Sequence, residues 1–137
     1  MKDDCIFCKI AAGEIPSKTL YEDDSYRVIL DLGPAAKGHA LIIPKEHCSD
    51  IYELPEQRAG EVFALAKKMA EKMRDALKCD GFNIVQNNGE IAGQTVFHFH
   101  MHLIPRYKDD GQKIGWNPGE PSEDELEETA RLIRGEA

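Results

Sequence analysis

The sequence predicts an α+β fold with an antiparallel sheet of about five strands, one long helix and a carboxyl-terminal helix. Three observations lead to this prediction. Short apolar or alternating runs are bounded by turn residues, as strands are. Most of these runs are joined by connections of hairpin length, which favours antiparallel pairing. One long segment carries apolar residues at the 3.6-residue spacing of a helix that covers a sheet.

Five segments are predicted to be strands, namely residues 19–22, 26–32, 37–44, 82–87 and 96–104. Their aliphatic, aromatic and β-branched residues are typical of strands, and Gly, Pro, Asp and Asn separate them. The aliphatic run within 37–44 suggests a central position in the sheet. Residues 10–15 are predicted to form a short helix and residues 49–54 a short helical turn.

The long helix is predicted to begin at Pro55, which suits a first helical position, and to run to about Lys78. The carboxyl-terminal helix has a capping box of Ser122 and Glu125, and Gly135 is expected to end it. The apolar stripe by which the long helix is predicted to face the core consists of Val62, Phe63, Ala66, Met69, Ala70, Met73 and Leu77.

Length and composition limit the classes of protein. The 137 residues suit one domain, and the net charge of −8 argues against binding to nucleic acid or to an anionic membrane. No apolar run reaches the length of a membrane span, and the amino terminus does not resemble a signal peptide. We therefore expect a cytoplasmic protein, whose four cysteines serve as thiols or metal ligands rather than as disulfides.

Histidine and apolar residues alternate in the segment 96–104, which predicts a strand with two different faces. His98, His100 and His102 are expected to share one face, and Phe97, Phe99, Met101 and Leu103 the core face. Neighbours on one face lie roughly 6–7 Å apart along a strand, so one zinc ion could bridge two of the histidines at most. At least one imidazole is therefore left for another role.

Cys5 and Cys8 form a single CxxC pair near the amino terminus. The pair could be half of a zinc site completed by histidines, a redox pair, or two buried cysteines that pack as small apolar side chains. No thioredoxin-like βαβ pattern follows, which disfavours the redox reading.

The chemistry expected of a neutral imidazole on a rigid strand is that of a general base, a metal ligand or a nucleophile. Thr95 and Gln94 lie just before the histidines and are neutral donors suited to a phosphoryl oxygen. A histidine nucleophile beside such donors indicates phosphoryl or nucleotidyl transfer.

The sequence resembles the histidine-triad (HIT) family of nucleotide hydrolases and transferases. His98-Phe99-His100-Met101-His102-Leu103-Ile104 matches the family pattern in full. The resemblance includes the CxxC pair, Gly38-His39, the Asn87 loop and Gly93-Gln94-Thr95-Val96, and it covers about residues 5–106. It implies a HIT-like fold, a HIT domain over residues 1–119 and an acidic helical tail over 120–137.

The resemblance also implies roles for single residues. His100 would attack the α-phosphorus and carry a transient nucleotidyl group, while His102, His39 and Thr95 assist catalysis. The third position of the triad is His102, where the related uridylyltransferases carry glutamine, so hydrolysis is favoured over transfer to a sugar phosphate. The expected nucleotide-binding residues are Phe7, Ile10, Ile15, Asp31, Asn87, Gln94, Thr95, His100 and His102.

Family members with the CxxC pair hold a structural zinc, and the resemblance implies Cys5, Cys8, His47 and His98 as its ligands here. Cys48 is a possible substitute for His47. The resemblance further implies a homodimer and a purine nucleotide substrate. The predicted function is hydrolysis of nucleoside 5′-phosphoramidates or dinucleoside polyphosphates to release nucleoside monophosphate. The alternatives are a metallohydrolase with strand histidines as zinc ligands, and a nucleotide-binding or scaffold protein without turnover.

Overall fold

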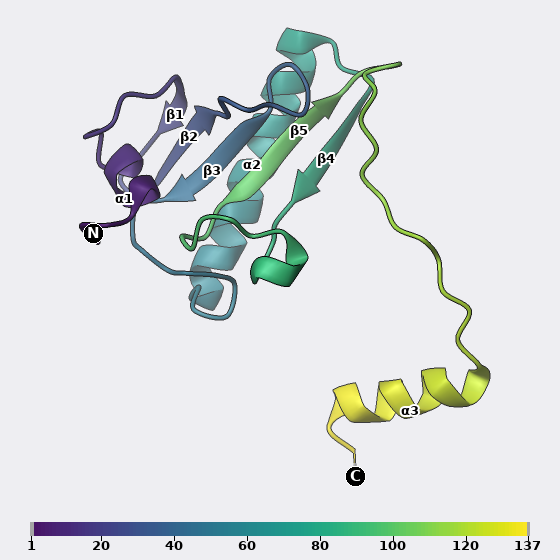
Figure 1. The fold of residues 1–137 in the computed structure, drawn as a ribbon. Coiled ribbons are helices and arrows are strands. Elements are labelled where there is room, and N and C mark those ends of the chain that lie inside the picture. Colours follow the sequence, from purple (N-terminus) through teal and green to yellow (C-terminus); the bar gives the residue numbers. More distant parts are fainter. Residues whose placement is uncertain (1, 137) are drawn as a thin grey trace.

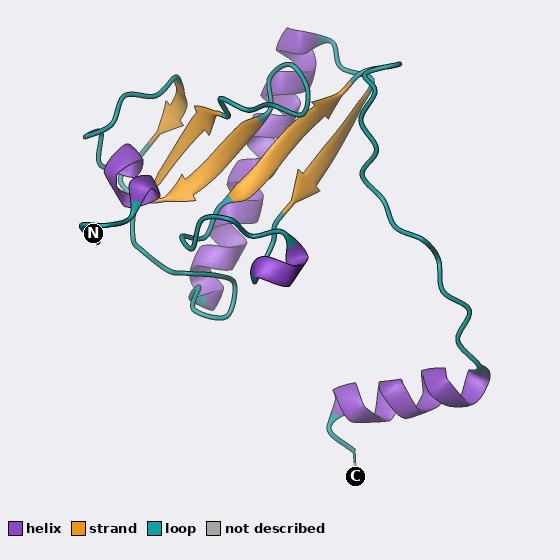
Figure 2. Cartoon of the chain, in the orientation of Figure 1, coloured by secondary structure: helices purple, strands orange, loops and turns teal. Residues whose placement is uncertain are grey.

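The computed structural model describes residues 2–136, and Figure 1 shows a five-stranded sheet lying against one long helix. The strands follow the order β1-β2-β3-β5-β4, and each neighbouring pair is antiparallel. The predicted α+β class and antiparallel sheet are thereby confirmed (Figure 2). The strands are β1 (Thr19–Glu22), β2 (Tyr26–Leu30), β3 (Ala40–Pro44), β4 (Gly81–Val85) and β5 (Met101–Arg106).

Helix α2 (Glu56–Leu77) covers one face of the sheet, after an N-cap at Pro55 and before a left-handed C-cap at Lys78. These bounds confirm the prediction to within one residue at each end. Phe63 is an exception to the predicted buried stripe, because it lies beside the edge strand β4 and is 58% exposed. The core between α2 and the sheet includes Val28, Ala40, Ile42, Val62, Leu65, Ala66, Met69, Met73, Phe99, Met101 and Leu103.

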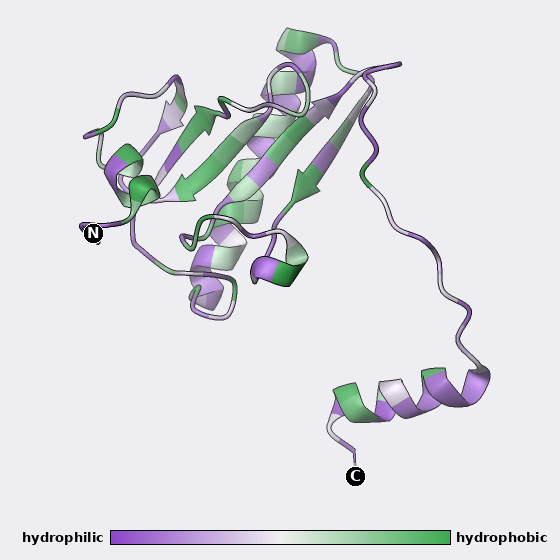
Figure 3. Ribbon diagram, viewed as in Figure 1, coloured by the Kyte–Doolittle hydropathy of each residue, from purple (hydrophilic) through white to green (hydrophobic). Residues whose placement is uncertain are grey.

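Helix α1 (Ile6–Ala11) packs on the opposite face, where alternate residues of β2 and β3 point. The prediction of a helix over 10–15 was wrong at its start, because the Cys5 side chain caps the helix by accepting a hydrogen bond from the Cys8 amide at 3.3 Å. Residues 49–54 form turns rather than the predicted helical turn. Figure 3 shows the hydrophobic residues gathered on β2 and β3, between these two layers.

The predicted strand over 96–104 is confirmed only from Met101 onward. Residues 96–100 run beside the loop that follows β3, where the Phe99 amide donates to the Cys48 carbonyl at 2.6 Å. Phe97 was predicted to face the core, but it is 51% exposed because this irregular stretch has no strand neighbour to hold the alternation. His98 and His100 therefore approach the sheet from a loop, and His102 alone of the three lies within β5.

Beyond β5 an ion pair holds the chain against the end of the strand, and the chain then leaves the domain. Arg106 binds the Asp110 carboxylate at 2.8 and 2.9 Å. An extended segment leads to α3 (Glu123–Arg134), which stands apart from the sheet (Figure 1). Its predicted cap at Ser122 and end at Gly135 are confirmed. Among residues 2–136, no helix has the length and apolarity required to span a bilayer.

Candidate active site and metal centre

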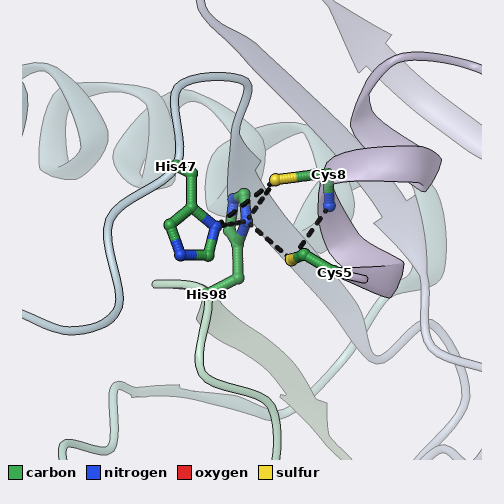
Figure 4. A group of neighbouring side chains, drawn as sticks. All are labelled: Cys5, Cys8, His47 and His98. Atoms are coloured by element: carbon green, nitrogen blue, oxygen red, sulfur yellow. Dashed lines mark hydrogen bonds between the residues drawn. The ribbon is translucent and has the colours of Figure 1, made fainter. Parts of the chain in front are cut away.

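Four side chains from distant parts of the chain converge beside the start of α1 (Figure 4). Cys5 and Cys8 come from the start of α1, His47 from the loop after β3, and His98 from the segment before β5. The His98 Nδ1 atom lies 3.4 Å from Cys5 Sγ, 3.5 Å from Cys8 Sγ and 3.2 Å from His47 Nδ1. Cys8 Sγ lies 3.3 Å from His47 Nδ1. These atoms thus surround one point.

The donor set fits a tetrahedral metal ion. With Zn–S near 2.3 Å and Zn–N near 2.0–2.1 Å, neighbouring ligand atoms of a tetrahedral zinc site lie about 3.3–3.8 Å apart, close to the spacing here. His98 Nε2 donates its proton to the Pro44 carbonyl at 2.8 Å, so the neutral ring presents an unprotonated Nδ1 to the cluster. The four residues could therefore hold zinc.

Burial keeps the imidazole of this cluster neutral. Burial, with smaller contributions from nearby His47 and His100, lowers the pKa of His98 to about 4. Burial also lowers the pKa of His47 and raises the pKa of the Cys8 thiol. A divalent cation would reverse the effect on the thiol, because the thiolate is the form that binds metal.

His100 is held in one tautomer by the backbone. Its Nδ1 lies 2.7 Å from the His98 carbonyl oxygen, which can only accept, so Nδ1 carries the proton and Nε2 the free lone pair. The ring is 8% exposed, and the edge-on ring of Phe7 packs against it at a centroid distance of 4.9 Å. Burial lowers the pKa of His100 and so favours the neutral ring.

His39 and His102 form a directional hydrogen-bond chain. The Ala35 amide donates to His39 Nδ1 at 2.9 Å, so the proton of His39 is on Nε2. That Nε2 donates to His102 Nδ1 at 2.9 Å, which leaves the proton of His102 on its own Nε2. Asp31 Oδ2 lies 3.6 Å from His39 Nε2.

The same chain argues against a second metal site, although donor atoms of Asp31, His39 and His102 lie within 4.8 Å of one another. A metal on His39 Nε2 would displace the proton that this atom donates. The proton could not move to Nδ1, because Nδ1 already accepts from the Ala35 amide.

A pocket of about 510 Å³ opens between α1, β2 and the segment before β5. It contains most of the predicted nucleotide-binding residues, namely Phe7, Ile10, Ile15, Asp31, Thr95, His100 and His102. Sequence reasoning missed the cation Lys18 and the apolar wall residues Ile29, Leu32, Leu41 and Val96. Ile29 could have been predicted, because the two-residue alternation of a strand places it on the same face as Asp31. No feature of the local sequence distinguishes Lys18 from the other lysines.

The HIT domain family model matches residues 12–109 of this chain. The chain belongs to the HIT domain family. The resemblance stated from the sequence is thereby confirmed.

Individual HIT proteins are similar over most of this chain. The crystal structure of SMU.412c from Streptococcus mutans UA159 superposes with a TM-score of 0.94 at 44% identity, covering 98% of this chain and 86% of that one. Adenosine 5′-monophosphoramidase HNT1 of Saccharomyces cerevisiae is 44% identical over 123 residues, which are 89% of this chain and 75% of the yeast protein. A zinc-bound histidine triad family protein from Mycobacterium smegmatis is 37% identical, with a TM-score of 0.77 and coverage of 96% and 91%.

Two residues expected to contact nucleotide lie elsewhere in this HIT domain. Gln94 is 2% exposed, and its amide donates to the Ser49 and Val96 carbonyls while accepting from the Gly89 amide. Both ends of the Gln94 side chain are therefore engaged in holding the loop. Asn87 lies against Gly93, 3.2 Å from where a Cβ atom would stand, and is not among the pocket residues.

Cys48, considered above as a substitute for His47, packs elsewhere. It is 6% exposed and belongs to the core under α2. The side chain of His47 faces the cluster instead.

Proposed function

We propose that this HIT protein is a nucleotide hydrolase that cleaves at the α-phosphorus of nucleoside 5′-phosphoramidates, with dinucleoside polyphosphates as a second substrate class. The observation that carries the proposal is the hydrogen bond from His100 Nδ1 to the His98 carbonyl, which leaves Nε2 free to attack. The likeness to yeast HNT1, an adenosine 5′-monophosphoramidase, supports the choice of phosphoramidates.

In the first step His100 Nε2 forms a bond to the α-phosphorus while the P–N bond, or the P–O bond of a dinucleotide, breaks. The leaving group takes the bond's electron pair and a proton from water. In the second step water attacks phosphorus and releases a proton to solvent, which balances the proton taken up by the leaving group. The Nε2–P bond breaks at the same time, and its electron pair returns to the imidazole. The products are nucleoside monophosphate and the released amine or nucleotide.

Neighbouring groups suit the charge that develops on the phosphoryl oxygens. The hydrogen-bond chain through His39 keeps the proton of His102 on Nε2, where it can be donated to an oxygen of the substrate. Thr95 also lines the pocket and offers a hydroxyl. Lys18 places a positive charge at the pocket wall, which locally opposes the repulsion that a net charge of −8 exerts on a phosphate compound.

The apolar walls suit a purine base, and a carboxylate suits the ribose. Phe7, Ile10 and Ile15 line one side of the pocket with little polar surface to distinguish one base from another. Asp31 stands at the end of β2, where its carboxylate can accept hydrogen bonds from ribose hydroxyls.

A zinc ion bound by Cys5, Cys8, His47 and His98 would have a structural role. Four protein ligands complete a tetrahedron and leave no position for water or substrate, unlike the open site of a catalytic zinc. This argues against the metallohydrolase alternative. The cluster would act on catalysis indirectly, because His98 also supplies the carbonyl that orients His100.

A homodimer formed along β4 is part of the proposal. Strand β4 is an edge of the sheet, and an unpaired edge tends to pair with another strand. Beside it lies a groove of about 540 Å³ that includes Phe63, which is 58% exposed, and Ile84, which is 39% exposed. Exposed apolar groups at a free edge suit an interface between two copies.

The experiment that tests the hydrolase proposal is AMP release from adenosine 5′-phosphoramidate by the wild type and by His100→Ala. We expect turnover and, after rapid quenching, an adenylyl adduct detectable by mass in the wild type but not in His100→Ala. Phe97→Ala is a matched control, since it changes an exposed residue of the same segment outside the pocket and should retain activity.

Circular dichroism must show that all three proteins are folded. Equal turnover by His100→Ala would remove this residue from the mechanism. Tight AMP binding without turnover on either substrate class would favour the binding-protein alternative.

A further inference from the structure

Helix α3 has an apolar face with nothing packed on it within the described chain. Leu126, Ala130 and Ile133 recur at i, i+4 and i+7, and Leu132 borders them. Leu126 is 55%, Leu132 69% and Ile133 82% exposed. The helix is nonetheless capped at both ends, so it has the features of a formed element rather than of a loose tail.

The flanks of that face are acidic. At 100° per residue, Glu123 borders the apolar stripe on one side, followed by Arg134, whose charge is paired with Glu127 and Glu136. Glu125 lies on the other side, next to Leu132. A surface that binds α3 should therefore be an apolar groove with positive charge at its rim.

Such a groove lies on the domain, between the carboxyl-terminal half of α2 and strands β1 and β2. It has a volume of about 370 Å³ and is separate from the nucleotide pocket. Lys37 and Lys72 are its charged residues, and it contains no carboxylate. The remaining residues are Leu20, Leu30, Gly38, Met69, Met73, Ala76 and Leu77.

The course of the tail favours the groove of another copy over that of the same chain. Gln112 is held on the domain by its backbone. Its backbone N–H donates to the Asp110 carboxylate at 3.0 Å, and its backbone carbonyl accepts a hydrogen bond from Arg106. From residue 113 to 121 no hydrogen bond joins the tail to any other described residue. These nine residues can span about 30 Å. They lead past the β4 edge, and α3 stands beyond it (Figure 1).

We propose that α3 of one copy packs its apolar face into this groove of a second copy, with Glu123 and Glu125 beside the partner's Lys37 and Lys72. The inference rests on the homodimer proposed above and is independent of the reaction at His100. Each subunit would then cover the helix of the other, so the contact would occur twice by symmetry.

The test is cross-linking in mixed dimers of the full chain. One chain carries Ala76→Cys in the groove, and a second, differently tagged chain carries Leu132→Cys on α3. The two are co-expressed and treated with a short bismaleimide. We expect a covalent product that contains both tags, formed several-fold more readily than in wild-type protein with only its four native cysteines.

Ala64→Cys is the matched control for Ala76→Cys. Ala64 is an exposed alanine of the same helix, about 18 Å farther along its axis and outside the groove, so it should give little product. Light scattering gives the mass of the untreated protein. A monomeric mass would overturn the homodimer and the inference together. A dimeric mass with equal cross-linking at Ala64 would overturn the docking of α3 alone. A further variant carries Ala76→Cys and Leu132→Cys in one chain. Cross-linking only within that chain, and none between differently tagged chains, would also overturn the docking.

Discussion

Gly38→Ala is expected to destabilise the fold strongly, because two separate features of the structure require glycine at this position. Its φ of +90° lies in the region that L residues rarely adopt, and an alanine Cβ would overlap Leu77 Cδ1 of α2. The backbone strain costs about 1–3 kcal/mol, and the displacement of a packed side chain costs roughly 1–3 kcal/mol more. We therefore expect a loss of about 2–6 kcal/mol, against a total stability of roughly 5–15 kcal/mol.

Gly60→Ala is the matched control and should have the opposite sign. Gly60 lies within α2 with an ordinary backbone, and no atom stands within 4 Å of its added Cβ. Alanine should stabilise the helix there by about 0.5–1 kcal/mol.

The assay is urea unfolding of both variants and the wild type, followed by circular dichroism. Because Gly38 precedes His39, the first member of the histidine chain, turnover should fall in the same variant. A loss of less than about 1 kcal/mol for Gly38→Ala would show that neither the backbone strain nor the contact with Leu77 is present, since the strain of the backbone alone exceeds that value.

Three further predictions concern titration and metal. Burial lowers the pKa of His39, and burial together with nearby His100 and His39 lowers the pKa of His102 to about 4. Asp31 opposes both shifts without reversing them. Both rings therefore stay neutral at pH values well below the ordinary histidine pKa. The acid limb of the pH–rate profile should thus fall below about 6.5, and a limb above this value would contradict a neutral pair. Removing zinc, or Cys8→Ser, should lower the free energy of unfolding by about 4 kcal/mol if free zinc exceeds its Kd a thousandfold, as calorimetry with zinc analysis would show. Burial, and then Glu61, raises the pKa of Tyr26 to about 12, so its absorbance should titrate two units late and the stability it provides should be lost between about pH 10 and 12.

Much of the fold could be predicted because local signals and tertiary packing agree. The stripe of α2 and the Ser122 cap of α3 are local features that the structure keeps. The start of β5 could not be predicted, because alternation describes which way side chains point but not whether a neighbouring strand is present. At Phe99 the backbone partner is a loop carbonyl, so the strand pattern continues in sequence where the strand itself has not begun.

The site was predictable in its residue types and less so in its orientations. Residues such as Phe7 and His100 form the pocket wall, as the family resemblance implied. The direction of a side-chain amide is not encoded locally, and the amide of Gln94 turns to its own loop rather than to the pocket. The tautomer of His100 likewise depends on a carbonyl whose direction only the fold determines.

The link between Cys5 and His98 has a consequence for the order of biosynthesis. The two residues are separated by 93 positions. The first helix to leave the ribosome therefore cannot make this contact until one of the last segments of the domain has been synthesised. Closing so long a loop is slow. A metal ion bound to both Cys5 and His98 would then limit the conformational freedom of nearly the whole domain. A chain interrupted before residue 98 lacks His98, which completes the cluster with Cys5, Cys8 and His47 and supplies the carbonyl that orients His100. Under the proposed mechanism, translation products that end before residue 98 also lack His100 and should release no AMP.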